Sequence, residues 1–263
     1  MLAMNQSLLL LARASLASIV ALAGMGCASA SGDSVAESED DLRESASFTT
    51  WDFSGTSWPE TTRATVTTGS SVANVYSFTS GPYGGCIHGI SGDDGNEREW
   101  RLVPGLTATD SDIVSAWIGR TGGHAGQFGH VHRAIDLGKA TQAAVMVWGD
   151  AYVGTPFLLN VNVWRGREAA FQPTADNDVP LIDIRTIGIT EYPYLVRSRL
   201  RGSTVHVRVW KPGQSEPTAW QFARTLDGVP DGAGALGLLA PSHVAAGQFQ
   251  CYGKANFRRL RLP

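Results

Sequence analysis

The strongest alternation of apolar and polar side chains along the chain lies in residues 194–210. Apolar or small residues occupy every second position on both sides of Gly202-Ser203, and mostly charged or aromatic residues lie between them. A period of two is typical of a strand with one buried face, and a two-residue Gly-Ser break is typical of a tight hairpin turn. The pattern therefore predicts a hairpin with its valines on one face and its charges on the other. The expected register pairs Arg201 with Thr204, Arg199 with His206, and Arg197 with Arg208.

Residues 157–164 contain a second clear alternation. One face of this predicted strand carries Phe157, Leu159, Val161 and Val163, and the other carries Leu158, Asn160, Asn162 and Trp164. Further apolar or alternating runs, separated by glycine-rich turns, cover residues 113–119, 143–148, 181–184, 235–240 and 257–262. Many short strands with such turns are typical of an all-β protein. We predict a two-sheet antiparallel β-sandwich of the jelly-roll type.

The composition of the chain fits this fold class and limits its partners. Glycine accounts for 30 of the 263 residues and tryptophan for 8, while charged residues make up only 17%. The formal net charge is −3, so the chain lacks the general positive field that attracts nucleic acids. We therefore expect no nucleic-acid partner.

The N-terminal region has the pattern of an export signal. An apolar run over residues 14–25 is followed by Cys27, and residues 28–47 are mostly small, polar or acidic. The run has the length of a signal-peptide core and is too short to cross a bilayer. The sequence around Cys27 resembles a bacterial lipoprotein signal, which implies cleavage before Cys27 and a lipid on its sulfur as the only membrane attachment. The alternative is an ordinary secretory signal cleaved after Ala30, and both alternatives place the protein outside the cytoplasm.

The remaining cysteines are consistent with export. We divide the chain into a signal peptide at residues 1–26, a lipidated flexible acidic tether at 27–47, and a sandwich domain at 48–263. Cys86 and Cys251 are the two cysteines of the domain, and in an oxidising compartment such a pair is more often bonded than free. We predict a disulfide between them, with two separate buried thiols as the alternative.

The segment from Gly129 to Trp220 has a spacing pattern that indicates a family. A strand is followed by a hairpin with an Arg-x-x-Gly turn and a closing Trp, then by a short loop with Pro and a second Trp. The residues in these positions are Arg199, Gly202, Trp210, Pro217 and Trp220. This arrangement resembles the laminin-G-like domains of the concanavalin A-like lectin/glucanase superfamily. The resemblance implies a two-sheet jelly roll, calcium held in loops, and roles that range from glycan binding and adhesion to glycan cleavage.

Paired carboxylates are the feature that would indicate a glycosidase. Glu39, Asp41 and Glu44 have the E-x-D-x-x-E spacing of glucanases, but they lie in the predicted tether, where nothing fixes their separation. Glu97 and Glu99 would share a strand face, and we interpret them as a solvated strand edge. The sequence does not support catalysis, although a glycoside hydrolase or polysaccharide lyase remains an alternative function.

Two histidines are candidates for a metal site. His130 and His132 lie two residues apart, so on a strand they point to the same side. A zinc site would need a third ligand, for which His124 or Asp136 is available. We interpret the pair instead as part of a polar strand face.

Calcium is the candidate cofactor with more support, since the family resemblance implies it. Asp110 with Asp112, and residues 176–178 (Asp-Asn-Asp), are short runs of the oxygen ligands that calcium prefers. Neither run has the spacing of an EF-hand loop.

Sugars bind proteins by stacking on indole rings and by hydrogen bonds from amide and guanidinium groups. The predicted polar faces provide both kinds of group, namely Asn160, Asn162 and Trp164 on one strand and Arg199, His206, Arg208 and Trp210 on the hairpin. On one concave sheet these residues would form a single platform, and the arginines would favour an acidic glycan. We predict an exported, lipid-anchored protein that binds carbohydrate or mediates adhesion without catalysis. A structural or protein-interaction role is the second alternative.

Overall fold

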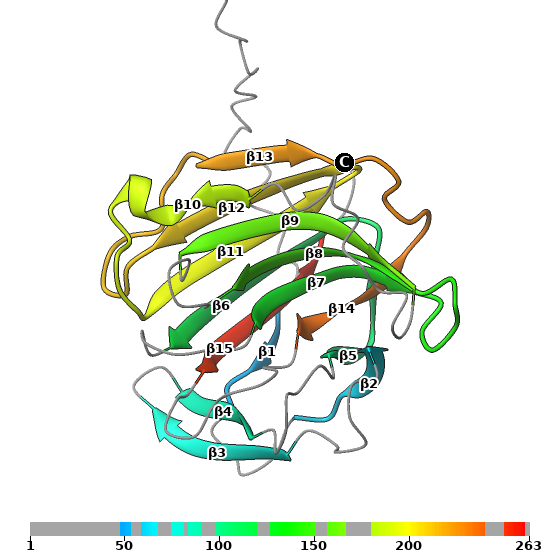
Figure 1. Ribbon diagram of the computed structural model, residues 1–263, viewed down its shortest axis with the longest axis horizontal. Coiled ribbons are helices and arrows are strands. Elements are labelled where there is room, and N and C mark those ends of the chain that lie inside the picture. Colours follow the sequence, from blue (N-terminus) through cyan, green and yellow to red (C-terminus); the bar gives the residue numbers. More distant parts are fainter. Residues whose placement is uncertain are drawn as a thin grey trace, which may run out of the picture. The chain divides into compact units, whose positions relative to one another are not determined.

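Two antiparallel sheets lie one behind the other and enclose the main apolar core (Figure 1). The computed structural model describes residues 48–53, 59–67, 75–81, 84–90, 98–119, 127–150, 157–166, 180–239 and 250–260. All of these residues belong to one compact unit, Glu39–Pro263. The predicted signal peptide and tether, residues 1–47, lie outside the described residues. In the part of the chain described, no helix has the length and hydropathy needed to cross a membrane.

The first sheet has seven strands in the order β10-β9-β8-β7-β14-β5-β2. Their bounds are Thr62–Thr67 (β2), Arg98–Ala108 (β5), Gln127–Ile135 (β7), Ala143–Asp150 (β8), Leu158–Arg165 (β9), Pro180–Asp183 (β10) and Gly234–Leu239 (β14). A short 3-10 helix, Ile184–Ile187, follows β10.

The second sheet has six strands in the order β1-β15-β6-β11-β12-β13. Their bounds are Thr49–Trp51 (β1), Ser111–Gly119 (β6), Tyr194–Arg201 (β11), Thr204–Trp210 (β12), Phe222–Thr225 (β13) and Gln250–Arg259 (β15). A separate hairpin consists of β3 (Val75–Gly81) and β4 (Gly84–Ile90). The predicted all-β, two-sheet antiparallel jelly roll is confirmed.

The β11–β12 hairpin has the register that the alternation predicts. Arg201 pairs with Thr204, Arg199 with His206, and Arg197 with Arg208. Gly202 in the turn has a φ of 57°, a left-handed conformation that glycine adopts without steric strain. Because the side-chain period is two, this register places every valine of the hairpin on the face opposite the arginines.

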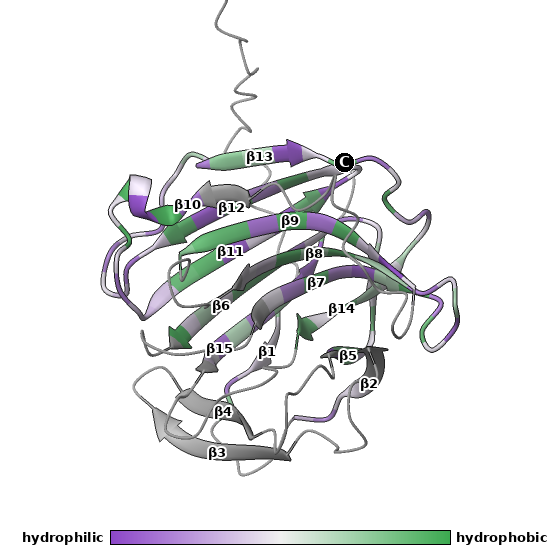
Figure 2. Ribbon diagram, viewed as in Figure 1, coloured by the Kyte–Doolittle hydropathy of each residue, from purple (hydrophilic) through white to green (hydrophobic). Residues whose placement is uncertain are grey.

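The space between the sheets is filled by these apolar faces. Val196, Leu200, Val205, Val207 and Val209 of the hairpin belong to one buried cluster with Leu159, Val161 and Val163 of β9. The predicted core face of residues 157–164 is therefore confirmed. Figure 2 shows hydrophobic and hydrophilic positions alternating along β9 and β11. The asparagines of β9 and the arginines of β11 consequently face away from the main core.

Cys86 and Cys251 are carried by neighbouring strands. Cys86 lies on β4 and Cys251 on β15, and these two strands lie against each other. The side chains of both cysteines are outside the described part of the structure, and no disulfide is among the contacts that it describes. The Cys86–Cys251 bond therefore stays a prediction.

Candidate functional site

The seven predicted binding residues do not form one platform. Asn160, Asn162 and Trp164 lie on β9 of the seven-stranded sheet. The other four, Arg199, His206, Arg208 and Trp210, lie on β11 and β12 of the six-stranded sheet. Because the core lies between the sheets, the two groups occupy outer faces on opposite sides of the sandwich. The expectation of a single concave surface was wrong, since alternation within a strand does not tell which sheet the strand joins.

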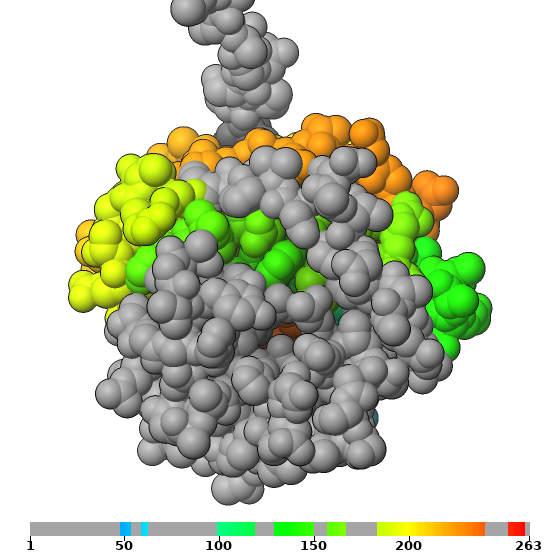
Figure 3. Space-filling model, viewed as in Figure 1, coloured from blue at the N-terminus to red at the C-terminus, as the bar shows by residue number. Residues whose placement is uncertain are grey.

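We call the first surface the indole–amide face, defined by Trp100, Met146, Trp148, Asn160, Asn162 and Trp164. The Trp148 indole nitrogen donates a hydrogen bond of 3.0 Å to the Asn162 amide oxygen, and its ring meets Trp164 edge-on with centroids 5.7 Å apart. Trp164 is only 1% exposed, while Trp148 and Asn160 are each 7% exposed. Some residues from the middle of the chain (green) are visible at the surface in Figure 3, but Trp100, Met146 and Asn162 are completely buried. Trp164 itself is therefore no open stacking platform.

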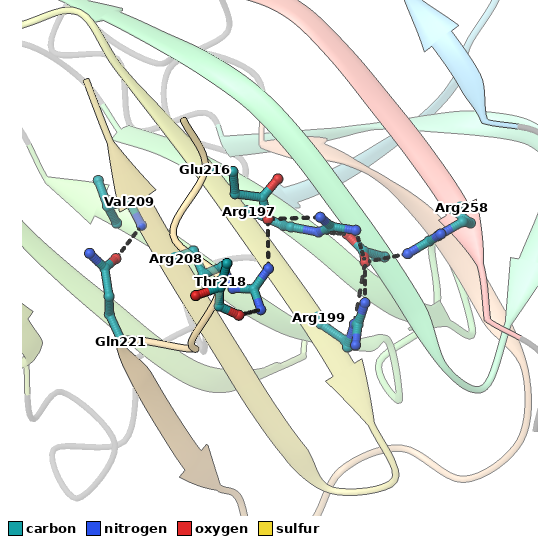
Figure 4. A network of polar contacts seen from close by, with 9 residues as sticks. Arg197, Arg199, Arg208, Val209, Glu216, Thr218, Gln221 and Arg258 are labelled. Atoms are coloured by element: carbon teal, nitrogen blue, oxygen red, sulfur yellow. Dashed lines mark hydrogen bonds and ion pairs between the residues drawn. The ribbon is translucent and has the colours of Figure 1, made fainter. Parts of the chain in front are cut away.

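We call the second surface the arginine face, defined by Asp112, Arg197, Arg199, Arg208, Glu216, Trp220 and Arg258. Asp112 lies at its centre and is fully buried. Strand pairing places Arg258 of β15 and Arg199 of β11 on either side of Asp112. Arg197 donates two hydrogen bonds to the Asp112 carboxylate, at 2.8 and 2.7 Å, and Arg199 and Arg258 donate at 3.1 and 2.9 Å (Figure 4). One carboxylate thus holds three guanidinium groups.

A second carboxylate and an indole complete the arginine face. Glu216 accepts hydrogen bonds from Arg197 at 2.8 Å and from Arg208 at 2.9 Å (Figure 4). Arg208 also donates to the Thr218 carbonyl oxygen. The guanidinium carbon of Arg208 lies 4.0 Å from the ring centroid of Trp220, which is within the range of a cation–π contact. Trp220 is partly exposed, so this surface includes an accessible indole.

Among the described residues, the arginine face carries an excess of positive charge, although the whole chain has a net negative charge. Four guanidinium groups share two carboxylates, and the Nε atoms of Arg208 and Arg258 are buried with no hydrogen-bond partner among the described residues. Burial alone would raise the pKa of Asp112, but the hydrogen bond and charge of Arg197, with the charges of Arg199 and Arg258, outweigh it and lower this pKa. The carboxylate therefore stays ionised and fixes the arginines in place.

Trp210 and His206 have different surroundings on this face. Trp210 is buried, with 8% of its surface exposed. His206 is partly exposed, and its ring lies 5.5 Å from that of Trp220. Of the four predicted hairpin residues, Arg199, His206 and Arg208 meet around Trp220, and Trp210 does not provide an open indole.

His130 and His132 do point to the same side of β7, but that side is the sandwich interior. Ser198 Oγ lies 2.6 Å from His130 Nδ1 and 2.7 Å from His132 Nε2. Ser115 and Ser111 each lie 2.7 Å from the other ring nitrogens. The two histidines therefore do form a polar strand face, but it is a buried one, because serines of β6 and β11 provide partners that the local pattern cannot reveal.

Both imidazoles are held neutral. Burial, with the charge of His132, lowers the pKa of His130 well below 6.5. Burial also lowers the pKa of His132 to about 3, with Asp112 acting against this shift and Arg133 adding to it. A neutral imidazole donates through one nitrogen and accepts through the other, which suits a chain of hydroxyls. This pair joins the two sheets and has no open position for a ligand.

The calcium candidates at Asp110 and Asp112 have other partners. Asp110 accepts a hydrogen bond of 2.8 Å from the Gly202 backbone nitrogen and lies 3.5 Å from Arg133. Among the described residues no group of three His, Cys, Asp or Glu side chains could hold a metal ion. Residues 176–178 and His124 lie outside the described residues, so calcium at 176–178 stays a prediction.

The interpretation of Glu99 as part of a solvated strand edge was wrong. Glu99 is fully buried and lies 2.5 Å from the guanidinium of Arg101. Glu97 is outside the described residues. Arg101 follows Glu99 by two residues and so shares its strand face. This spacing is the sequence signal that could have identified the ion pair.

Comparison with known proteins shows similarity of fold only. No protein-family model and no curated protein matches the chain. The CBM2 module of the evolved Dit of Lactobacillus casei BL23 phage J-1 is 14% identical, with a TM-score of 0.47, over 82% of this chain and 96% of that one. Lectin II from Ulex europaeus is 8% identical, with a TM-score of 0.48, over 81% and 97%. The Ca2+/Man3GlcNAc-bound exoplasmic domain of VIP36 is 9% identical, with a TM-score of 0.46, over 73% and 84%.

Proposed function

We propose that this chain is an exported, lipid-anchored surface protein whose sandwich binds acidic carbohydrate through the arginine face, without catalysis. The observation that carries the proposal is the excess of guanidinium over carboxylate around a partly exposed indole. The sequence resemblance to laminin-G-like domains supports carbohydrate as the ligand class. Export and the lipid on Cys27 rest on the N-terminal sequence pattern.

The chemistry of the arginine face suits an anionic sugar. The guanidinium groups of this face outnumber its carboxylates among the described residues, and guanidinium groups bind carboxylate and sulfate oxygens strongly. The partly exposed Trp220 ring offers an apolar surface for the C–H groups of a sugar. Arg199 and His206 flank this ring, while Asp112 holds the arginines in one geometry.

A binding measurement tests the proposal. The full chain in a non-ionic detergent is titrated with a polyuronate and with a neutral glucan, at low and at high salt. We expect binding to the polyuronate alone, weakening as salt screens the charges. Trp220→Ala should weaken it about tenfold, the loss of one stacking contact. Arg185→Gln removes an exposed guanidinium from outside the arginine face and should leave binding unchanged.

The outcomes distinguish the alternatives. Equal binding to both polysaccharides, or polyuronate binding that Trp220→Ala does not weaken, would refute the arginine face as the site. Release of new reducing ends from the polyuronate would favour the glycoside hydrolase or lyase. Binding to neither polysaccharide would favour a structural or protein-interaction role. The anchor is tested separately, by the mass of the N-terminal peptide, which should begin at a lipidated Cys27 and not after Ala30.

A further inference from the structure

An acidic stretch of the chain lies a few residues before Phe48, which contacts Arg258 of the arginine face. Residues 39–44 contain four carboxylates and one arginine. The described chain begins at Phe48, which is 43% exposed, and the guanidinium carbon of Arg258 lies 4.9 Å from the centroid of its ring. The chain therefore enters the described fold against one arginine of the proposed binding surface.

We propose that residues 39–44, which we call the acidic segment, dock on the arginine face and compete with the acidic carbohydrate for it. This inference rests on the proposed function for its regulatory meaning, because it concerns the same surface. Charge complementarity supports it, since the arginine face has more guanidinium groups than carboxylates and the segment has the opposite imbalance.

The length of the chain permits this contact. Arg258 and Arg208 lie on β15 and β12, which are three positions apart in the six-stranded sheet, or about 14 Å at the usual strand spacing. Glu44 lies four residues before Phe48, and Asp41 lies seven residues before it. Fully extended, these two stretches of chain span about 13 Å and about 23 Å. Asp41 and the carboxylates before it can therefore reach from Phe48 to the strand of Arg208, and Glu44 reaches the nearer strands, without displacing Phe48 from Arg258.

The physical consequence is a competition that depends on salt. A segment joined to its own site by a few residues has a local concentration on the order of millimolar, so even weak ion pairs keep the site partly occupied. A long polyanion makes more contacts at once and displaces the segment. Because both contacts are electrostatic, the competition weakens as salt rises.

The test changes the charge of the segment in the full chain. Glu39→Gln, Asp41→Asn and Glu44→Gln together remove three negative charges. The matched control removes three exposed carboxylates elsewhere, with Glu60→Gln, Glu191→Gln and Asp227→Asn. We expect the segment variant to bind polyuronate about threefold more tightly than the control at low salt, with the difference disappearing at high salt.

A second measurement separates this inference from the proposed function. Hydroxyl-radical oxidation of Trp220 and Phe48, without any polysaccharide, should rise in the segment variant and not in the control. Increased oxidation without polyuronate binding would support the docking and refute the proposed function. Polyuronate binding with equal affinities and equal oxidation in the two variants would overturn the docking and leave the proposed function in place.

Discussion

Acidification should destabilise this protein through two buried histidines. His130 and His132 are fully buried, and each ring contacts two serine hydroxyls, with Ser198 shared between them. Their pKa values lie below 6.5 in the folded protein, and for His132 the pKa is about 3. The unfolded chain therefore binds more protons than the folded chain below pH 6.5. Stability that is present above this pH is lost as the pH falls toward the folded pKa values.

The magnitude follows from this difference in proton binding. For each pH unit below 6.5, the free energy of unfolding falls by about 1.4 kcal/mol per histidine, as long as the ring stays neutral in the folded protein. Between pH 7 and pH 5 the two rings together remove about 4 kcal/mol, a large part of the stability of an ordinary domain. The charged groups acting on the pair are Asp112, which opposes the shift of both rings, and Arg133, which adds to that of His132.

Urea unfolding followed by tryptophan fluorescence at several pH values measures this loss. His132→Gln should reduce the loss between pH 7 and pH 5 by about half. Ser111→Ala, the control, removes a partner of His132 and lowers stability but keeps both imidazoles, so its pH dependence should equal that of the parent. An unchanged pH dependence in His132→Gln would refute the reasoning. If that variant does not fold, NMR titration of the parent decides, and an imidazole that titrates near pH 6.5 in the folded protein would refute it.

Three further changes have defined outcomes. Asp112→Asn should lower the free energy of unfolding by about 3 to 5 kcal/mol, since it leaves three buried arginines without their shared counter-ion; Asp183→Asn, at an exposed ion pair, should leave the melting temperature near that of the parent. Gly237→Ala should be destabilising by about 3 kcal/mol or more in chemical unfolding, because a Cβ there would lie 2.0 Å from the Arg101 carbonyl oxygen. Alkylation and mass analysis of the oxidised protein should find Cys86 and Cys251 blocked, and reduction should remove about 4 kcal/mol of stability; two thiols that alkylate without reduction would contradict the disulfide.

The local pattern was sufficient for several of the strands and for one hairpin. The period of two in residues 194–210, with a glycine that tolerates positive φ at the turn, defines both the register and the buried face. The same reasoning identified the core face of β9. These features depend on neighbours in the chain or on the pleat, and both can be read from sequence.

The candidate site depended on pairings between distant segments. Asp112 and Arg258 are 146 residues apart, and their contact arises because β15 pairs with β6. No local pattern indicates that Asp112 would have arginine partners and not calcium. The assignment of β9 and β12 to different sheets is equally non-local, which is why Trp164 and Trp210 could not form one platform.

Hydroxyl-radical footprinting of the full chain with and without polyuronate tests the central claim most directly, because it locates the ligand on one face of the sandwich. The account predicts that polyuronate reduces the oxidation of Trp220 and Phe48. The oxidation of Tyr192, which lies away from the arginine face, should not change. Unchanged reactivity of Trp220 and Phe48 at a polyuronate concentration that saturates binding would contradict the account.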